Sequence, residues 1–584
     1  MRDAARGTRA RGTRASSIFT GMPSPNSRAS ALSYALPFAL IFATARAVLA
    51  TPVDIANPVY DFLRRLEMEG RIKPGYLNTL PLAKSEVGAL LQEAQSHADA
   101  LTAWEKARLD GYREAFGLME SRDGRFHPLG YRDSSFQVGI RGQSFNGGYI
   151  EDSIPRAQTH AFGSLFGTIE GSYKDRIQFL STAGSGQERS LHERFTETYN
   201  PARGMPYNTD REGKSGIPRT VSTFDAFRTV VGYEEPDARL EFGTDWNQWG
   251  PGVWQHAFLS QRPWFWVQDS LPASDSAGFE GTPLAGRYRR GYRYPGESAP
   301  MTQMRMAIRM GKFSYTKVVA QRTGLWSDSL AHLVAHRLEY RPWGFLGLGM
   351  QEMIVTAGRT MDWTYIIPLV PLKYTEHELG DRDNAAVGMD AEVLLAGRGR
   401  VYGELLVDDF SGWDLDFWGD KFAYSLGAEA IGFPFAASRV QVEYAHVEPW
   451  VFTHRVPDDQ MQHFGALLGS SLPANSHAVH AAWEHPLRFD LDLRLEYAFM
   501  QRDAASRGSS PFDVHETDRD GTQKVFLGGI VETRHALDLS GTWRWRRFVE
   551  FRGSLGYLEV ENWKSEEGKS LSSPTLSGEL ILRY

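Results

Sequence analysis

Two stretches of this 584-residue chain bring tryptophans together with acids and amides. The first, TDWNQWGPGVWQHAFLSQRPWFW, spans residues 244–266, and the second, DDFSGWDLDFWGD, spans residues 408–420. Flat aromatic rings stack on the C–H faces of sugars, while carboxylates and amides hydrogen-bond sugar hydroxyls. The pattern therefore predicts a polysaccharide-binding surface. Its candidate residues are Asp245, Trp246, Trp249, Trp254, Arg262, Trp264, Asp408, Asp409, Trp413, Asp416 and Trp418.

For each tryptophan the alternative is a place in an aromatic girdle, where a membrane barrel meets the lipid headgroups. The two interpretations are evenly balanced for any single tryptophan. Clustering with aspartates and with Gly250-Pro251 favours ordered, functional loops.

Residues suited to covalent or metal chemistry are poorly arranged. His332 and His336 have HxxxH spacing, but HLVAH lacks the glutamate of a zinc protease, and parity alone puts both on one strand face. Asp408 and Asp409 are adjacent, so on a strand they point to opposite faces and cannot form a dyad without a bulge. The chain has no GxSxG or P-loop motif. We expect no catalytic residue, no metal site and no cofactor.

The element that must position these loops is an amphipathic strand. In Leu487 to Phe499, LRFDLDLRLEYAF, every odd position is apolar and the even positions are Arg, Asp, Glu or Ala. This period of two runs longer than a typical soluble strand and suits a tilted transmembrane β-strand. The charged face would line a lumen and the apolar face would meet lipid.

Similar strands counted back from the C-terminus number about eighteen, with sixteen as the alternative. The count places a tight turn at His485-Pro486 and treats residues 524–545 as one long strand. It predicts an all-β, antiparallel transmembrane barrel of the outer membrane. The long outer loops would lie at about 183–219, 246–302, 358–385, 447–477 and 500–523.

Three amphipathic helices precede the strands. Asn57-Pro58 begins the first, a second covers Lys84 to His97, and Thr102 with Glu105 forms a capping box for the third. We expect residues 51–130 to form a small periplasmic helical bundle or plug, and residues 131–584 to form the barrel.

Composition indicates export. Residues 1–50 resemble a cleaved signal peptide, with Met22 as an alternative start, and no later segment is apolar enough for a spanning helix. They carry seven arginines and one aspartate, so cleavage lowers the formal net charge from −7 to −13 and argues against a nucleic-acid partner. The chain has no cysteine, which excludes disulfides and thiolate metal sites.

Five segments resemble the capsule-assembly (Wzi-type) outer-membrane proteins. They are YDFLRRLEMEGRI (60–72), LPLAKSEVGALLQEA (80–94), WNQWGPG (246–252), RDNAAVGMDAEVLLAG (382–397) and RVYGELLVDDF (400–410). The resemblance implies an eighteen-stranded barrel with a periplasmic helical bundle. It also implies a lectin-like role, holding capsular or extracellular polysaccharide at the surface of a Gram-negative cell.

The expected partners are therefore polysaccharide, outer-membrane lipid, and the barrel assembly machinery, which would read the last strand ending at Tyr584. A porin-like diffusion channel is the main alternative, because paired lumen charges can also set the field in an open pore. An outer-membrane enzyme that modifies lipid or glycan is the weaker one.

Overall fold

The computed structural model describes most of the chain after residue 50. The described ranges are 51–116, 129–132, 136–153, 156–174, 176–190, 205–214, 217–261, 300–323, 331–395, 397–412, 414–456, 459–463, 466–470, 472–510, 513–545 and 549–583. Residues 48–584 form one compact unit. The predicted signal peptide and Tyr584 lie outside the described residues.

Three helices form in the predicted segments: α2 (Val59–Met68), whose N-cap is Pro58 rather than Asn57, α3 (Lys84–Ser96) and α4 (Ala103–Ala115). Thr102 and Glu105 form the expected capping box, in which each side chain bonds the backbone N–H of the other. The apolar stripes of the helices meet in one cluster that includes Leu63, Leu66 and Leu91. None of the described helices is long and apolar enough to cross a membrane.

The rest of the described chain is mainly a closed antiparallel β-barrel of 18 strands, which confirms the predicted fold class. The ring comprises β3 (Phe136–Ser153), β4 (Arg156–Tyr173), β5 (Ile177–Ser190), β7 (Ile217–Glu235), β8 (Ala238–Asp245), β10 (Met301–Met310), β11 (Phe313–Arg322), β12 (Ala331–Trp343), β13 (Leu346–Ala357), β14 (Asn384–Leu394), β15 (Gly399–Asp409), β16 (Lys421–Ile431), β17 (Arg439–Val447), β20 (Ser476–Arg488), β21 (Leu491–Arg502), β22 (Glu532–Trp545), β23 (Val549–Glu561) and β24 (Leu571–Arg583).

The ring closes where β24 pairs with β3, from Thr575 opposite Glu151 to Arg583 opposite Gln143. Two further strands, β2 (Leu129–Arg132) and β6 (Met205–Lys214), pair with β3 and β7. Shorter elements lie between the helices or in the connections between ring strands. They are β1 (Thr79–Leu80), β9 (Gln248–Trp249), β18 (Gln462–His463), β19 (Ala466–Leu467), α6 (Leu372–Glu378), α7 (Thr517–Asp520), η2 (Ala98–Ala100), η4 (Trp363–Ile366) and η6 (Trp563–Ser565).

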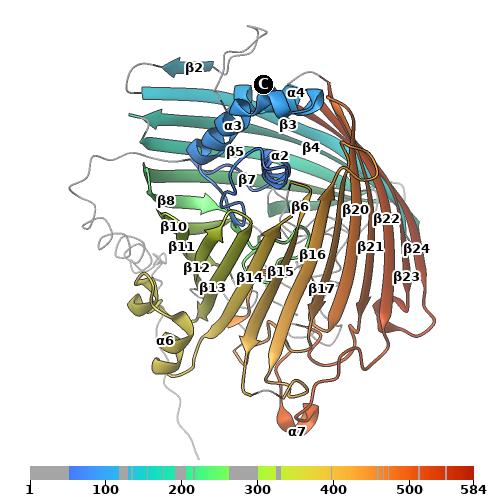
Figure 1. Cartoon of the computed structure of the whole chain (residues 1–584). Helices are drawn as coiled ribbons and strands as arrows, with labels where there is room; N and C mark the ends of the chain where they lie inside the picture. Colours follow the sequence, from blue (N-terminus) through green and yellow to red (C-terminus); the bar gives the residue numbers. More distant parts are fainter. Residues whose placement is uncertain are drawn as a thin grey trace, which may run out of the picture. The chain divides into compact units, whose positions relative to one another are not determined.

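The two ends of the barrel differ. One end carries tight turns, such as residues 311–312, 344–345 and 489–490, and we call it the short-turn end. The helices contact these turns: Tyr76 Oη donates to Gly311 O (3.1 Å), and Arg65 donates to Ala437 O (2.9 Å). In Figure 1, α2 to α4 lie at this end and α7 lies at the other, the long-loop end. In outer-membrane barrels, short turns face the periplasm and long loops face outward.

Two expected strand boundaries were wrong. The turn predicted at His485-Pro486 lies at residues 489–490, because β20 continues through Pro486 to Arg488 after a register shift. Pro486 has no N–H to donate, and the irregularity in the ladder accommodates it. The stretch 524–545 is one strand only from Glu532 onward, and residues 524–531 belong to the preceding connection.

Candidate functional site

Residues 246–261, which we call the lumen segment, leave β8 and fold as a hairpin inside the barrel. Backbone hydrogen bonds join its arms, from Trp249 N to Leu259 O (2.8 Å) and from Gln261 N to Asn247 O (2.9 Å). Trp249 and Leu259 are fully buried in a cluster with inward-facing wall residues. The segment therefore turns into the lumen.

Two wall glutamates hold the tip of the lumen segment. Glu404 of β15 accepts hydrogen bonds from Gly252 N (2.8 Å) and Ala257 N (2.7 Å). Glu443 of β17 accepts from the N–H groups of residues 253 and 255, at 2.8 and 2.6 Å. Hydrogen bonds to an ionised acceptor are roughly twice as strong as neutral ones. With Trp254 N, which also donates to Glu443 (3.3 Å), the two carboxylates fix the tip by accepting from five of its backbone N–H groups.

Glycine is required for this approach at Gly250 and Gly252. Gly250 has φ +109°, and a Cβ there would lie 2.3 Å from Glu404 Oε1. A Cβ on Gly252 would lie 2.1 Å from Gln255 O. Both distances are far shorter than any stable contact, which explains the GPG of the WNQWGPG segment.

Wall arginines hold the base of the lumen segment. Arg305 of β10 donates to Trp246 O (3.2 Å), to Asn247 Oδ1 (3.1 Å) and to Asp245 Oδ2 (2.9 Å). Arg228 of β7 donates to Asp245 Oδ1 (2.8 Å). All of these side chains are buried, so each charge depends on its partner.

The lumen segment also joins the helical region to a long loop. On one side β9 pairs with β1, and Gly250 N donates to Asn78 O (2.8 Å). On the other side Ser260 N donates to Leu468 O (2.6 Å) in the loop that follows β17. Phe452 and Leu472 of that loop are fully buried in the same cluster as the lumen segment. At this level the lumen segment and part of the loop after β17 pack together inside the barrel.

Five of the predicted ligand contacts lie in this interior. Asp245, Trp246, Trp249, Trp254 and Asp408 are all buried, with exposed fractions between 0% and 6%. The prediction that residues 246–261 lie on an outer loop surface is therefore wrong. Their tryptophans cluster because they pack a lumen, which the residue types alone do not distinguish from a sugar site. That these five residues contact a glycan stays a prediction. Three further predicted contacts, Arg262, Trp264 and Trp413, lie outside the described residues.

The remaining predicted residues lie at the long-loop end. Trp418 is half-buried and stacks on His515, with ring centroids 3.6 Å apart and planes 6° apart. Trp450 packs against Trp418 in a T-shaped arrangement, with ring centroids 6.4 Å apart. Lys421 Nζ lies 5.7 Å from the centroid of the Trp418 ring. Asp416 is exposed on the same loop. We call Asp416, Trp418, Lys421, Trp450 and His515 the outer cluster.

Backbone pairing between two loops makes the outer cluster ordered. Lys524 N donates to Asp416 O (2.8 Å), and Trp418 N donates to Thr522 O (3.2 Å). Burial lowers the pKa of His515, so its ring is neutral near pH 7. An ordered aromatic pair, with the exposed Asp416 carboxylate on the same loop as Trp418, can stack on a sugar and accept hydrogen bonds from its hydroxyl groups.

The residues weighed for catalysis are held in other contacts. Asp408 Oδ2 accepts from Phe452 N (2.9 Å), whereas Asp409 Oδ2 accepts from Lys421 Nζ (3.1 Å). A bulge separates Val407 and Asp409, yet the carboxylates of Asp408 and Asp409 still bind different partners. They therefore do not form a facing pair. His336 Nε2 lies 2.9 Å from Glu352 Oε2.

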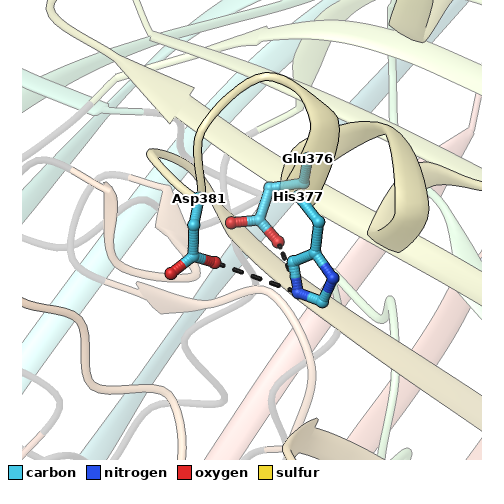
Figure 2. A group of neighbouring side chains, drawn as sticks. All are labelled: Glu376, His377 and Asp381. Atoms are coloured by element: carbon cyan, nitrogen blue, oxygen red, sulfur yellow. Dashed lines mark ion pairs between the residues drawn. The ribbon is translucent and has the colours of Figure 1, made fainter.

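One group of described side chains has metal-ligating atom types: Glu376, His377 and Asp381, in and just after α6. Figure 2 shows the His377 ring to one side of the two carboxylates, with Nε2 4.0 Å from Glu376 Oε2 and 3.9 Å from Asp381 Oδ1. Lys373 Nζ lies 3.1 Å from the same Glu376 oxygen. This ammonium already balances the buried carboxylate, so the geometry gives no reason to add a cation.

Sequence reasoning missed the wall residues Glu404 and Glu443. A signal was present, because Tyr402, Glu404, Leu406 and Asp408 share one strand parity and therefore one barrel face. The spacing of these residues in the sequence does not show which part of the chain this face of β15 contacts.

Comparison with solved structures places the fold. Wzi of Escherichia coli, an outer-membrane protein involved in group 1 capsule assembly and a carbohydrate-binding β-barrel, aligns with a TM-score of 0.55 and 14% identity. The alignment covers 92% of this chain and 99% of Wzi. The resemblance predicted from the sequence is thus confirmed as a likeness of fold.

Other solved barrels are more distant. OprD of Pseudomonas aeruginosa aligns over 78% of this chain and 96% of its own, at 10% identity and a TM-score of 0.41. OccAB2 of Acinetobacter baumannii aligns over 76% of this chain and 98% of its own, at 9% identity and a TM-score of 0.40. No protein-family model and no curated protein matches the chain.

Proposed function

We propose that this barrel binds capsular or extracellular polysaccharide at its long-loop end and holds it at the cell surface. The observation that carries the proposal is the anchored lumen segment. A barrel of this size normally encloses an aqueous lumen unless something fills it. Here Glu404 and Glu443 fix protein across that space, which suits a binding scaffold better than a diffusion channel.

The outer cluster supplies the chemistry for glycan binding. Trp418 and His515 form a flat aromatic pair, and Asp416, on the same loop as Trp418, offers an exposed acceptor. The carbohydrate-binding fold neighbour supports the same class of ligand.

The first test is deletion of the gene in its own encapsulated host, followed by measurement of cell-bound and released polysaccharide. We expect the released fraction to rise and the total to stay constant. Polysaccharide that remains attached in the deletion strain would contradict retention.

The second test is Trp418→Ala in the complemented strain and in glycan binding by the purified protein. Loss of one stacking platform should weaken binding by about 1 kcal/mol, roughly fivefold. Trp343→Ala is the matched control, because Trp343 is 59% exposed at the short-turn end. Equal binding by the two variants would exclude the outer cluster as the contact surface.

A further inference from the structure

A group of polar side chains lies on the outward face of the barrel wall. Along β13 the inward positions include Gln351 and Met353, whereas Leu348 and Met350 point outward and are 39% and 52% exposed. By the same parity Glu352 points outward, and so do its neighbours across the ladder, His336 of β12 and Lys317 of β11. These three side chains occupy positions that normally face lipid.

The loop after β13 covers this group. Residues 361–379, which we call the wall loop, contain η4 and α6, and α6 contacts β13 and β14. In Figure 1, α6 lies beside β13 near the long-loop end.

Specific hydrogen bonds fasten the wall loop to the wall. Lys317 Nζ donates to Ile367 O (2.7 Å), and Leu372 N donates to Glu352 Oε2 (2.6 Å). Leu369 N donates to Tyr315 Oη (3.0 Å), another outward-facing side chain. As a result Tyr315 and Lys317 are each only 3% exposed. The contacts satisfy groups that would be costly in lipid, where a lysine at mid-depth costs about 2–4 kcal/mol.

The wall loop therefore descends along the strands. Glu352 lies five residues from Ala357, the last residue of β13. With about 3.3 Å per residue and a tilt near 40°, that position is roughly 13 Å below the strand end. An apolar band of about 25 Å would reach this depth.

Within the wall loop, the free surface of residues 363–372 is apolar. Residues 363–372 read WTYIIPLVPL and contain no charged side chain. Ile367 and Leu369 are 55% and 67% exposed, and the outward-facing wall residue Met350 is likewise 52% exposed. Pro368 and Pro371 have no N–H group, so they leave fewer backbone donors to be satisfied away from water.

We propose that residues 363–372 of the wall loop are immersed in the outer leaflet of the membrane, where Ile367, Pro368 and Leu369 contact lipid acyl chains. The uncharged composition of residues 363–372, their two prolines and the bond of Leu369 N to the outward-facing Tyr315 all favour acyl chains as the occupant. The loop anchors this sector of the barrel and shields Lys317, His336 and Glu352 from lipid. The proposal does not depend on glycan binding.

Fluorescence quenching tests the proposal on the full-length mature chain, which has no native cysteine. Leu369→Cys is labelled with bimane and reconstituted in phosphatidylcholine–phosphatidylglycerol vesicles containing doxyl-labelled lipid. Met350→Cys serves as the lipid-facing control and Asp414→Cys as the water-facing control. Ile367→Cys is a second probe, and retention of the heat-modifiable band shows that each variant has folded.

We expect lipid quenching at Leu369 within about twofold of that at Met350, and iodide quenching far below that at Asp414. Strong iodide quenching at Leu369 would place the loop in water and overturn the proposal. Protection from both quenchers would also overturn it, because protein would then cover the loop. Disulfide-linked dimers of Leu369→Cys would identify that protein as a second copy of the chain.

Discussion

Gly250→Ala should release the tip of the lumen segment and open the barrel to ions. The native φ of +109° is available to glycine but strained by about 1–3 kcal/mol for alanine. The new methyl would also lie 2.3 Å from Glu404 Oε1, and such overpacking costs typically 1–3 kcal/mol. Together these effects oppose docking of the segment by about 4 kcal/mol.

Glu404 would have to move away to admit the methyl group. Its bonds to Gly252 N and Ala257 N would then be lost, which leaves buried donors unpaired. The wall strands keep their own ladder, so the barrel itself should still fold and show normal heat-modifiable migration.

The assay is single-channel conductance in planar bilayers, with liposome swelling as the second measurement. Gly311→Ala is the matched control, because Gly311 also has a positive φ (+62°) but nothing within 4 Å of its added Cβ. We expect larger and more frequent conductance steps for Gly250→Ala than for Gly311→Ala or the native protein. A large, steady conductance in the native protein, or identical traces for the two variants, would refute the account of a filled lumen.

Two further outcomes concern single carboxylates, Glu443 on the wall and Glu69 in the helical region. Glu443→Gln should weaken docking of the lumen segment by roughly 2 kcal/mol, because an amide offers only one acceptor oxygen to the donors at residues 253 and 255. Urea unfolding of the native protein and of the variant would measure this loss of stability. Burial and the nearby Glu105 carboxylate raise the pKa of Glu69 to about 7, above its unfolded value, so the folded protein keeps a proton that the unfolded chain loses. Stability should fall between about pH 4.5 and pH 7, and Glu69→Gln should flatten that part of the profile; an unchanged slope would show that other groups set it.

The amino-acid sequence by itself determined the architecture. Alternation of apolar and polar residues is a local property with a period of two, so the ring strands could be located from the sequence and counted as about eighteen. The helices were equally readable, since a capping box such as Thr102 with Glu105 acts within three residues. Boundaries were less certain where Pro486 continues a strand that it would ordinarily end.

Only the tertiary structure decided which way the loops turn. Trp249 and Trp254 lie in a segment whose residue types suit a sugar-binding surface, yet both side chains are buried. They are buried because Glu404 and Glu443, more than 140 residues away in the sequence, bind the segment inside the barrel. The wall loop shows the converse: Ile367 and Leu369 have the composition of a core but lie on the outside of the barrel. Strand periodicity fixes the face on which a side chain lies, whereas the partner that meets that face depends on contacts between distant parts of the chain.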